Sequence, residues 1–254
     1  MSKNPFDLVE RFTIYYGESS PQVINRLKTN HLIIIEPQQF TKEQIADIRA
    51  AGTIVLGYLS VMESPTWNKQ RTEAIQVGDY LLEGGRRVHF AQWDAYIMDL
   101  RSTQYQDLLQ SEIQTHIVDL NMDGVFLDTI DDIDYQVKDP FVQAQHRQCY
   151  KNFLHKLVTR HPQLSILQNR GFDSLTAASP YLHGILWEGW RSGWQYDLWT
   201  KLRVNRLQAE QIKGLKIFSS TTTIDTIHGA EARELGFLHI DIPEGYYKLT
   251  NPSF

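Results

Sequence analysis

Two acidic residues end strongly apolar runs in the sequence. Asp128 ends the run GVFLD, and Glu188 ends the run GILWE. Glycoside cleavage needs such a pair, because one carboxyl group protonates the leaving oxygen while the other attacks the anomeric carbon or activates water. Partial burial at a strand end would separate the two pKa values and keep one group protonated near neutral pH. The sequence therefore predicts a pair with Asp128 as nucleophile or general base and Glu188 as general acid.

Each of these residues also has a structural interpretation. Asp128 could cap a helix in the acidic turn DTIDDID, and Glu188 could pair with Arg170 or Arg191. Trp187 and Trp190, beside Glu188, could be packing residues instead of a platform on which a sugar ring stacks. The functional interpretation of the pair rests on both residues ending strands.

Other chemistries have less support. The sequence contains no GxSxG, HExxH, GxGxxG or GxxxxGK[ST] motif. A group of four aspartates could bind calcium or magnesium, but it lacks the turn glycine and the terminal glutamate of an EF-hand loop. This group consists of Asp128, Asp131, Asp132 and Asp134. We predict no cofactor and no metal, with a metal-dependent hydrolase as an alternative.

The elements that would position the pair alternate regularly. Eight short runs rich in β-branched and aromatic residues are each followed by helical spacing, which is typical of βα units around a parallel sheet. Eight units in one domain, 1–254, predict a single α/β (β/α)8 TIM barrel; a doubly wound sheet, the alternative, would usually have fewer strands. The predicted strands are 12–16, 32–36, 53–59, 124–128, 164–168, 184–188, 216–220 and 237–241.

One connection is unusually long. About 40 residues separate the third strand from a helix beginning near Thr103, and they include the short apolar run AYIMDLR. In a barrel this loop lies on the C-terminal rim, where active sites are built. The rim positions that we expect to bind substrate are Tyr16, Glu63, Trp187, Trp190 and Asp241.

Composition restricts the partners. The net charge is -5, from 30 acidic and 25 basic residues, and the basic residues are scattered, which argues against nucleic acid. Cys149 is the single cysteine, so no disulfide can form within the chain. No apolar run approaches the roughly 20 residues that span a bilayer. We expect a cytoplasmic protein as written, or an extracellular one if a signal peptide or anchor has been removed, and leave its oligomeric state open.

Five segments carry a resemblance to a known family. They are GYLSVMES (57–64), AYIMDLRS (95–102), DGVFLDTIDD (123–132), QNRG (168–171) and ILWEGW (185–190). In order and spacing, along nearly the whole chain, the sequence resembles glycoside hydrolase family 114, the endo-α-1,4-polygalactosaminidase-like barrels. The most specific segment is DGVFLD followed by TID.

The resemblance implies a hydrolase of α-linked amino-sugar polysaccharides that contain galactosamine, with Asp128 and Glu188 at the catalytic positions. It also implies that four residues hold sugar hydroxyls: Tyr58, Asp99, Asp131 and Asn169. The sequence departs from the family at VMES after the third strand and at Thr129, where the family often has Asn. These departures concern the substrate more than the fold, and they motivate a non-catalytic carbohydrate-binding barrel as the alternative function.

Overall fold

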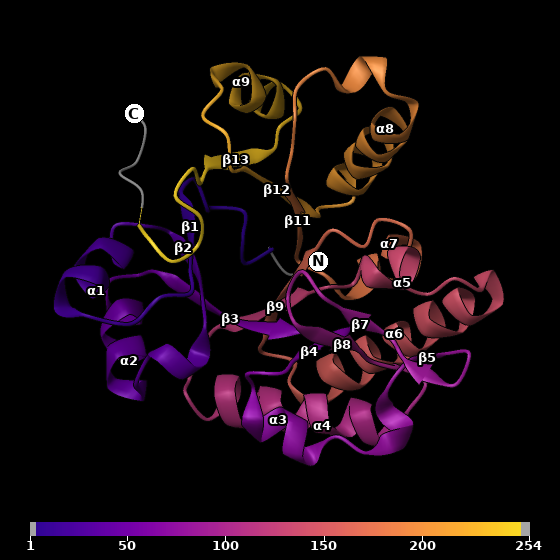
Figure 1. The fold of residues 1–254 in the computed structure, drawn as a ribbon. Coiled ribbons are helices and arrows are strands. Elements are labelled where there is room, and N and C mark those ends of the chain that lie inside the picture. Colours follow the sequence, from indigo (N-terminus) through magenta and orange to yellow (C-terminus); the bar gives the residue numbers. More distant parts are fainter. Residues whose placement is uncertain (1–3, 250–254) are drawn as a thin grey trace.

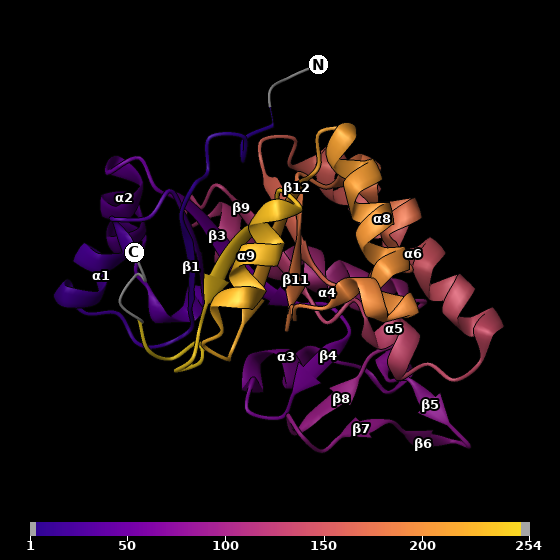
Figure 2. The same cartoon turned by 90° about the horizontal axis from the view of Figure 1, so that it is seen from above.

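The computed structural model describes residues 4–249, so the ends of the predicted domain 1–254 lie outside the described residues. Eight parallel strands form one sheet that curves into a barrel, with helices around its outside (Figures 1 and 2). In sheet order the strands are β1 (Phe12–Tyr15), β2 (Leu32–Ile35), β3 (Ile54–Ser60), β9 (Gly124–Asp128), β10 (Ser165–Asn169), β11 (Gly184–Glu188), β12 (Lys216–Thr221) and β13 (Leu238–Asp241). Each predicted strand agrees with the observed one to within one residue at either end, and the predicted (β/α)8 barrel is confirmed.

The helices begin where the sequence provides capping groups. Thr41 Oγ1 accepts a hydrogen bond from Gln44 N at 3.3 Å while Gln44 Oε1 accepts from Thr41 N at 2.8 Å, which is a capping box. Asp139 caps the longest helix by accepting from Phe141 N at 2.8 Å. The helices outside the barrel are α1 (Pro21–Leu27), α2 (Lys42–Ala50), α4 (Thr103–Ile113), α5 (Asp132–Tyr135), α6 (Pro140–Arg160), α7 (Leu175–Ala178), α8 (Leu198–Ile212) and α9 (Thr226–Glu234), with single turns η1 (Pro37–Gln39), η3 (Gln114–Val118), η4 (Ser179–Tyr181) and η5 (Trp194–Tyr196).

Alternation along the strands divides the core into two layers. Side chains two residues apart fill the barrel interior, and those between them pack against the surrounding helices. The interior cluster is Phe6, Val9, Phe12, Ile14, Leu32, Ile34, Leu56, Phe126, Leu167, Leu186, Phe218 and Ile242. Phe6 comes from the segment before β1 and meets the Phe218 ring edge-on at 5.7 Å. The N-terminal segment thus contributes to the barrel interior.

The long connection after β3 is structured. It contains a three-stranded antiparallel sheet, β4 (Glu63–Pro65), β8 (Ala95–Ile97) and β7 (His89–Phe90), and the hairpin β5 (Leu82–Glu83) with β6 (Arg86–Arg87). It also contains α3 (Lys69–Ala74) and η2 (Val77–Asp79). Figure 2 shows this segment on one side of the barrel, beyond the strand ends. Because it leaves the C-terminal end of β3, it lies over the barrel mouth.

Among residues 4–249, no helix is both long and apolar enough to cross a membrane.

Candidate active site

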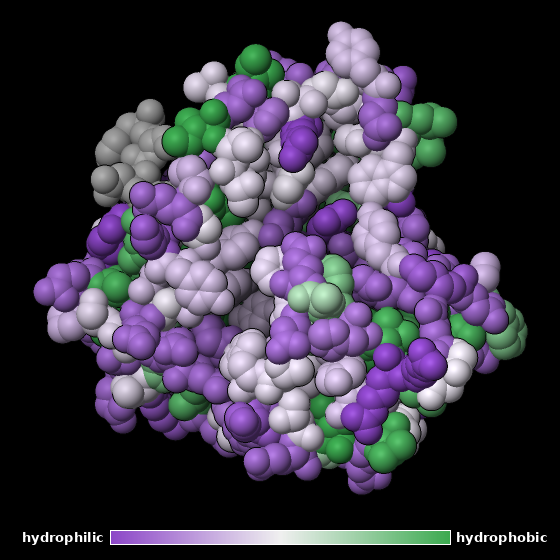
Figure 3. All heavy atoms as spheres, viewed as in Figure 1, coloured by the Kyte–Doolittle hydropathy of each residue, from purple (hydrophilic) through white to green (hydrophobic). Residues whose placement is uncertain are grey.

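The barrel mouth is lined by the residues that continue the interior pattern of each strand. Leu56 is interior, so Tyr58, two residues later, faces the mouth; Phe126 positions Asp128 and Leu186 positions Glu188 in the same way. Figure 3 shows this face, which is hollowed near its middle and mostly hydrophilic. Alternation therefore brings both predicted carboxylates into one opening.

Asn169, at the end of β10, joins the two carboxylates. Its Nδ2 donates to Asp128 Oδ1 at 2.8 Å and to Glu188 Oε2 at 2.6 Å. The Asn169 side chain is only 3% exposed. The strand order β9, β10, β11 explains the arrangement, because the amide comes from the strand between the two acids. The structure thus brings Asp128, Asn169 and Glu188 together.

The environment of Asp128 favours its protonated form. Burial, followed by the negative charge of Glu188, raises the pKa of Asp128 to about 7, although hydrogen bonds from Asn169 and from the Thr129 backbone oppose this rise. A carboxyl group with this pKa exchanges its proton near neutral pH. General acid–base catalysis requires such a group.

Three tyrosines lie around the pair. The Tyr16 ring is 5.0 Å from that of Tyr58 and 5.3 Å from that of Tyr246, between ring centroids. The Tyr246 hydroxyl donates to Glu188 Oε1, and a hydrogen bond joins Tyr58 to Asp128. Burial and then the charge of Asp128 raise the pKa of Tyr16 and of Tyr58 well above their usual value, so both hydroxyls stay protonated as donors.

Tyr246 was not predicted from the sequence. It follows the last strand in the turn IPEGYY, beyond any periodic element, and its neighbour Tyr247 is 73% exposed. The Tyr246 carbonyl accepts from Tyr16 N at 2.7 Å, which attaches this segment to the end of β1. The paired tyrosines after a turn were the only sequence signal, and they do not indicate which of the two faces the mouth.

The backbone is constrained just after two of the site residues. Thr129 follows Asp128 with φ 66°, and Arg170 follows Asn169 with φ 45°. A positive φ is unusual for a β-branched residue and costs roughly 1–3 kcal/mol. The Thr129 hydroxyl compensates by accepting from Val61 N at 3.1 Å and Met62 N at 2.8 Å. Asn tolerates this conformation more readily, which gives a backbone reason for the Asn that the family often has here.

A second carboxyl pair lies nearby. Glu63, of β4, and Asp132, which begins α5, are 8% and 6% exposed and share a hydrogen bond. Burial, then the Glu63 charge, raises the pKa of Asp132 to about 9. Burial likewise raises the pKa of Glu63. At neutral pH Asp132 is therefore protonated and donates to Glu63.

Asp131 lies between the two pairs. Its Oδ2 is 3.3 Å from Arg170 Nε, and its charge contributes to the raised pKa values of Asp128 and Asp132. Burial raises its own pKa, and Arg170 opposes this effect. Within the described residues, no three His, Cys, Asp or Glu side chains are arranged to hold a metal ion.

Both predicted tryptophans lie away from the mouth. Trp187 is 4% exposed and Trp190 is fully buried. The rings pack edge-on at 5.0 Å, and Trp190 Nε1 donates to the His228 carbonyl. Because Glu188 faces the mouth, Trp187 must face the helices on the other side of the strand. Neither ring offers a face to a sugar, so we leave both out of the proposed site.

Asp99 and Asp241 are likewise not brought to the pair. Asp99 accepts from Arg101 Nη2 at 2.6 Å and lines a separate depression with Cys149. Asp241 lies 3.2 Å from His239 Nε2 on the outward side of β13, because the interior positions there are Leu238, Ile240 and Ile242. Both side chains serve local polar networks.

Comparison with known proteins shows the family. Glycoside-hydrolase family GH114 matches residues 3–215. The glycoside hydrolase domain of PelA from Pseudomonas aeruginosa is similar in structure, with TM-score 0.76, 19% identity and coverage of 92% of this chain and 94% of that chain. Aspergillus fumigatus Ega3 in complex with galactosamine has TM-score 0.67 and 14% identity, with coverage of 91% and 89%. No curated protein sequence matches the chain. The family match over most of its length shows that the chain belongs to glycoside-hydrolase family GH114 and is a glycosidase.

Proposed function

We propose that this glycosidase cleaves α-linked galactosamine-containing polysaccharide with Asp128 and Glu188 as its catalytic pair and with retention of configuration. One observation carries the proposal, namely the single amide nitrogen of Asn169 that binds both carboxylates in the barrel mouth. The substrate class is supported by the family and by the galactosamine bound to the similar Ega3 fold.

The separation of the carboxyl groups supports retention. Asp128 Oδ1 and Glu188 Oε2 share one nitrogen at 2.8 and 2.6 Å, so these oxygens are no farther apart than the sum of the two distances. Retaining glycosidases hold their carboxyl groups about 5–5.5 Å apart, whereas inverting ones need about 6.5–9.5 Å to admit a water molecule. The separation allowed by the shared amide is therefore that of a retaining enzyme.

The contacts also support separate roles. Asp128 accepts hydrogen bonds from Asn169, the Thr129 backbone and Tyr58, and these stabilise its ionised form. Glu188 is the second largest cause of the raised Asp128 pKa. As the pH rises through about 7, Asp128 loses its proton and becomes available as the nucleophile. Asp128 then attacks the anomeric carbon as Glu188 protonates the departing oxygen, and Glu188 next takes a proton from the water that releases the sugar.

The negative surroundings suit a cationic substrate. Asp131 is partly exposed beside Glu188, and Glu63 and Asp132 add two further carboxyl groups close by. Free amines of galactosamine are protonated at this pH, so the field of the mouth attracts them. We include Tyr16, Tyr58 and Asp131 among the residues that contact substrate, whereas Glu63 is buried against Asp132.

The test replaces each carboxylate and then supplies an external nucleophile. On de-N-acetylated galactosaminogalactan, Asp128→Ala and Glu188→Ala should each lower kcat at least about 10³-fold, because each removes a nucleophile or general acid. Glu234→Gln, at the exposed end of α9, is the matched control and should retain activity. Unchanged cleavage by either alanine variant contradicts the assignment.

Azide rescue separates the two roles. With an activated α-glycoside, Asp128→Ala plus azide should yield the β-glycosyl azide, because azide attacks in place of the missing nucleophile. Glu188→Ala plus azide should yield the α-glycosyl azide by attack on the covalent intermediate. The opposite pattern would exchange the roles, and an inverted product from the wild-type enzyme would exclude retention.

A further inference from the structure

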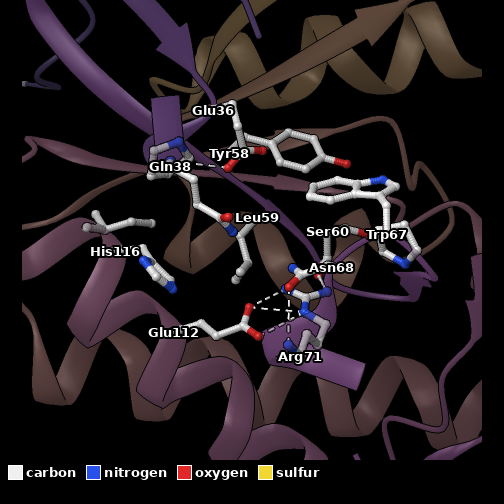
Figure 4. Close-up of a pocket in the computed structure, with 13 residues that line it drawn as sticks. Glu36, Gln38, Tyr58, Leu59, Ser60, Trp67, Asn68, Arg71, Glu112 and His116 are labelled. Atoms are coloured by element: carbon white, nitrogen blue, oxygen red, sulfur yellow. Dashed lines mark hydrogen bonds and ion pairs between the residues drawn. The ribbon is translucent and has the colours of Figure 1, made fainter. Parts of the chain in front are cut away.

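A second pocket adjoins the barrel mouth. It lies between the ends of β2 and β3, the start of the long connection and the end of α4, and leaves about 40 Å³ of room for a ligand group. This space admits a small group such as an ammonium group, while the rest of a ligand would lie outside it. Figure 4 shows Glu36, Tyr58 and Trp67 toward one side of it and the Arg71–Glu112 ion pair toward the other. Tyr58 also contacts Asp128, so one side chain forms a wall of both the pocket and the mouth.

Trp67 gives the pocket an exposed aromatic face. Its side chain is 61% exposed although it lines a concave surface, whereas Trp187 and Trp190 are buried in the core. A flat, exposed indole at the wall of a polar pocket can stack on the apolar face of a sugar ring. Gln38 and Asn68 line the same pocket and can reach ring hydroxyls.

Glu36 gives the pocket a negative charge. It is half-buried and takes part in none of the ion pairs found among the described residues. Arg71 is the nearby cation, but it is 3% exposed and its guanidinium group forms an ion pair with Glu112, with Nε 2.9 Å from Oε1. The positive charge of Arg71 is therefore compensated, and the carboxylate of Glu36 remains available to a ligand.

Capping alone does not account for Glu36. Its side chain accepts from Gln38 N, but at 3.4 Å, and it caps only the three-residue turn η1. A long contact to an exposed turn offsets little of the cost of burying a carboxylate. The carboxylate of Glu36 would gain an ion-pair partner when a cationic ligand binds.

We propose that this pocket and the exposed face of Trp67 together form an additional sugar-binding subsite of the cleft, with the ring of one amino-sugar unit against Trp67 and its ammonium group in the pocket at Glu36. Its substrate class rests on the proposed function, but its existence as a binding site does not. An ammonium group would form an ion pair with Glu36 without disturbing the Arg71–Glu112 pair.

The charge of Glu36 predicts a pH-dependent affinity. Burial raises its pKa to about 7, the backbone of Gln38 and the charge of Arg71 oppose the rise, and the charge of Glu112 adds to it. His116 lines the same pocket. Binding of a protonated amine at Glu36 should therefore strengthen as the pH rises through about 7, and Glu36→Gln should lose this part of the pH dependence.

The test compares long and short galactosamine oligosaccharides. Trp67→Ala and Glu36→Gln should each raise KM about tenfold for long oligosaccharides, with kcat unchanged, and leave the shortest cleavable oligosaccharide unaffected. Trp93→Ala is the matched control, because Trp93 is also 61% exposed in the same connection but does not line the pocket. Equal effects on long and short substrates, or none on either, overturn the proposal.

A binding measurement separates this proposal from the catalytic one. In an Asp128→Asn background, calorimetry with long galactosamine oligosaccharides should show about tenfold weaker binding after Trp67→Ala and no change after Trp93→Ala. If the wild-type enzyme fails to cleave these oligosaccharides but binding still depends on Trp67, the subsite stands and the proposed activity falls. If it cleaves them and binding ignores Trp67 and Glu36, the subsite falls alone.

Discussion

The mouth of the barrel contains two carboxyl pairs that differ in what joins them. Asp128 and Glu188 are connected through the amide of Asn169, whereas Glu63 and Asp132 are hydrogen-bonded directly. The raised pKa is about 7 for Asp128 and about 9 for Asp132. Both shifts begin with burial, so the difference lies in the partners: three hydrogen-bond donors surround Asp128, whereas Asp132 acts as a donor to Glu63.

The comparison shows how one rim can use the same chemical group in two ways. In the direct pair, the proton lies between Glu63 and Asp132, which are both almost fully buried. Their hydrogen bond joins β4 to α5. A pair separated by an amide keeps its proton exchangeable near neutral pH and leaves its carboxylates open to a substrate. The first arrangement supports structure, and the second supports the proposed catalysis.

Among the substitutions that test the difference between the two pairs, removal of the Asn169 amide should have the largest effect on catalysis. Asn169→Ala leaves Asp128 without one of its side-chain donors, and loss of a donor to the ionised form raises the pKa of Asp128 further. We expect kcat to fall about 100-fold, or about 2.7 kcal/mol, as the two carboxylates lose their alignment. The acidic limb of the pH–rate profile should move to higher pH.

The control for Asn169 is its neighbour on the same strand. Gln168 is also buried, but its side chain faces the helices and accepts from the Tyr150 hydroxyl at 2.9 Å. Gln168→Ala should lower the melting temperature without moving the pH–rate profile. A profile that shifts equally in both variants would show that Asn169 acts through general stability and not through the pair.

Removing the titratable carboxyl group of Asp132 should instead change how stability depends on pH. The pKa of Asp132 is about 9 in the folded protein and about 3.8 when exposed, so its contribution to stability is complete below about pH 4 and is lost as the pH rises through about 9. Asp132→Asn keeps a neutral donor to Glu63 at every pH. We expect the variant to match the wild type near pH 4 and to be more stable by about 2 kcal/mol, or roughly 4–8 °C, near pH 9.

Thermal unfolding across this pH range measures the difference. Asp107→Asn, on the exposed side of α4, controls for the loss of one negative charge and should show no such trend. An Asp132→Asn curve parallel to that of the wild type would mean that the pair shares no proton. Activity near neutral pH should change little, because Asp132 is already protonated there.

The sequence predicted the barrel and its central pair because each depends on a local pattern. Strand ends follow from apolar runs, and the carboxylates follow from those ends. Alternation would also have excluded Trp187, since it cannot face the mouth when Glu188 does. Trp187 lies next to Glu188 in the sequence, but its side chain lies on the opposite face of the strand.

The remaining site residues depend on contacts between distant segments. Glu63 meets Asp132 only because the connection after β3 folds back as β4, and Tyr246 reaches Glu188 only because its segment attaches to the end of β1. By contrast, Asp99 is held by Arg101, only two residues away, and this local ion pair competes with any role in the mouth. No periodicity in a single sequence encodes such encounters.

The smallest expected effect concerns the hydroxyl that distinguishes Glu188 from the members of the direct pair. Tyr246→Phe removes the donor to Glu188 Oε1 and keeps the ring that packs 5.3 Å from Tyr16. Glu188 would still be held by Asn169, so we expect kcat to fall about tenfold, or about 1.4 kcal/mol, with KM unchanged. Tyr247→Phe, one residue along and 73% exposed, should behave as the wild type. A rise in KM with constant kcat would instead assign the Tyr246 hydroxyl to the binding of substrate, and the alignment of Glu188 would then depend on Asn169 alone.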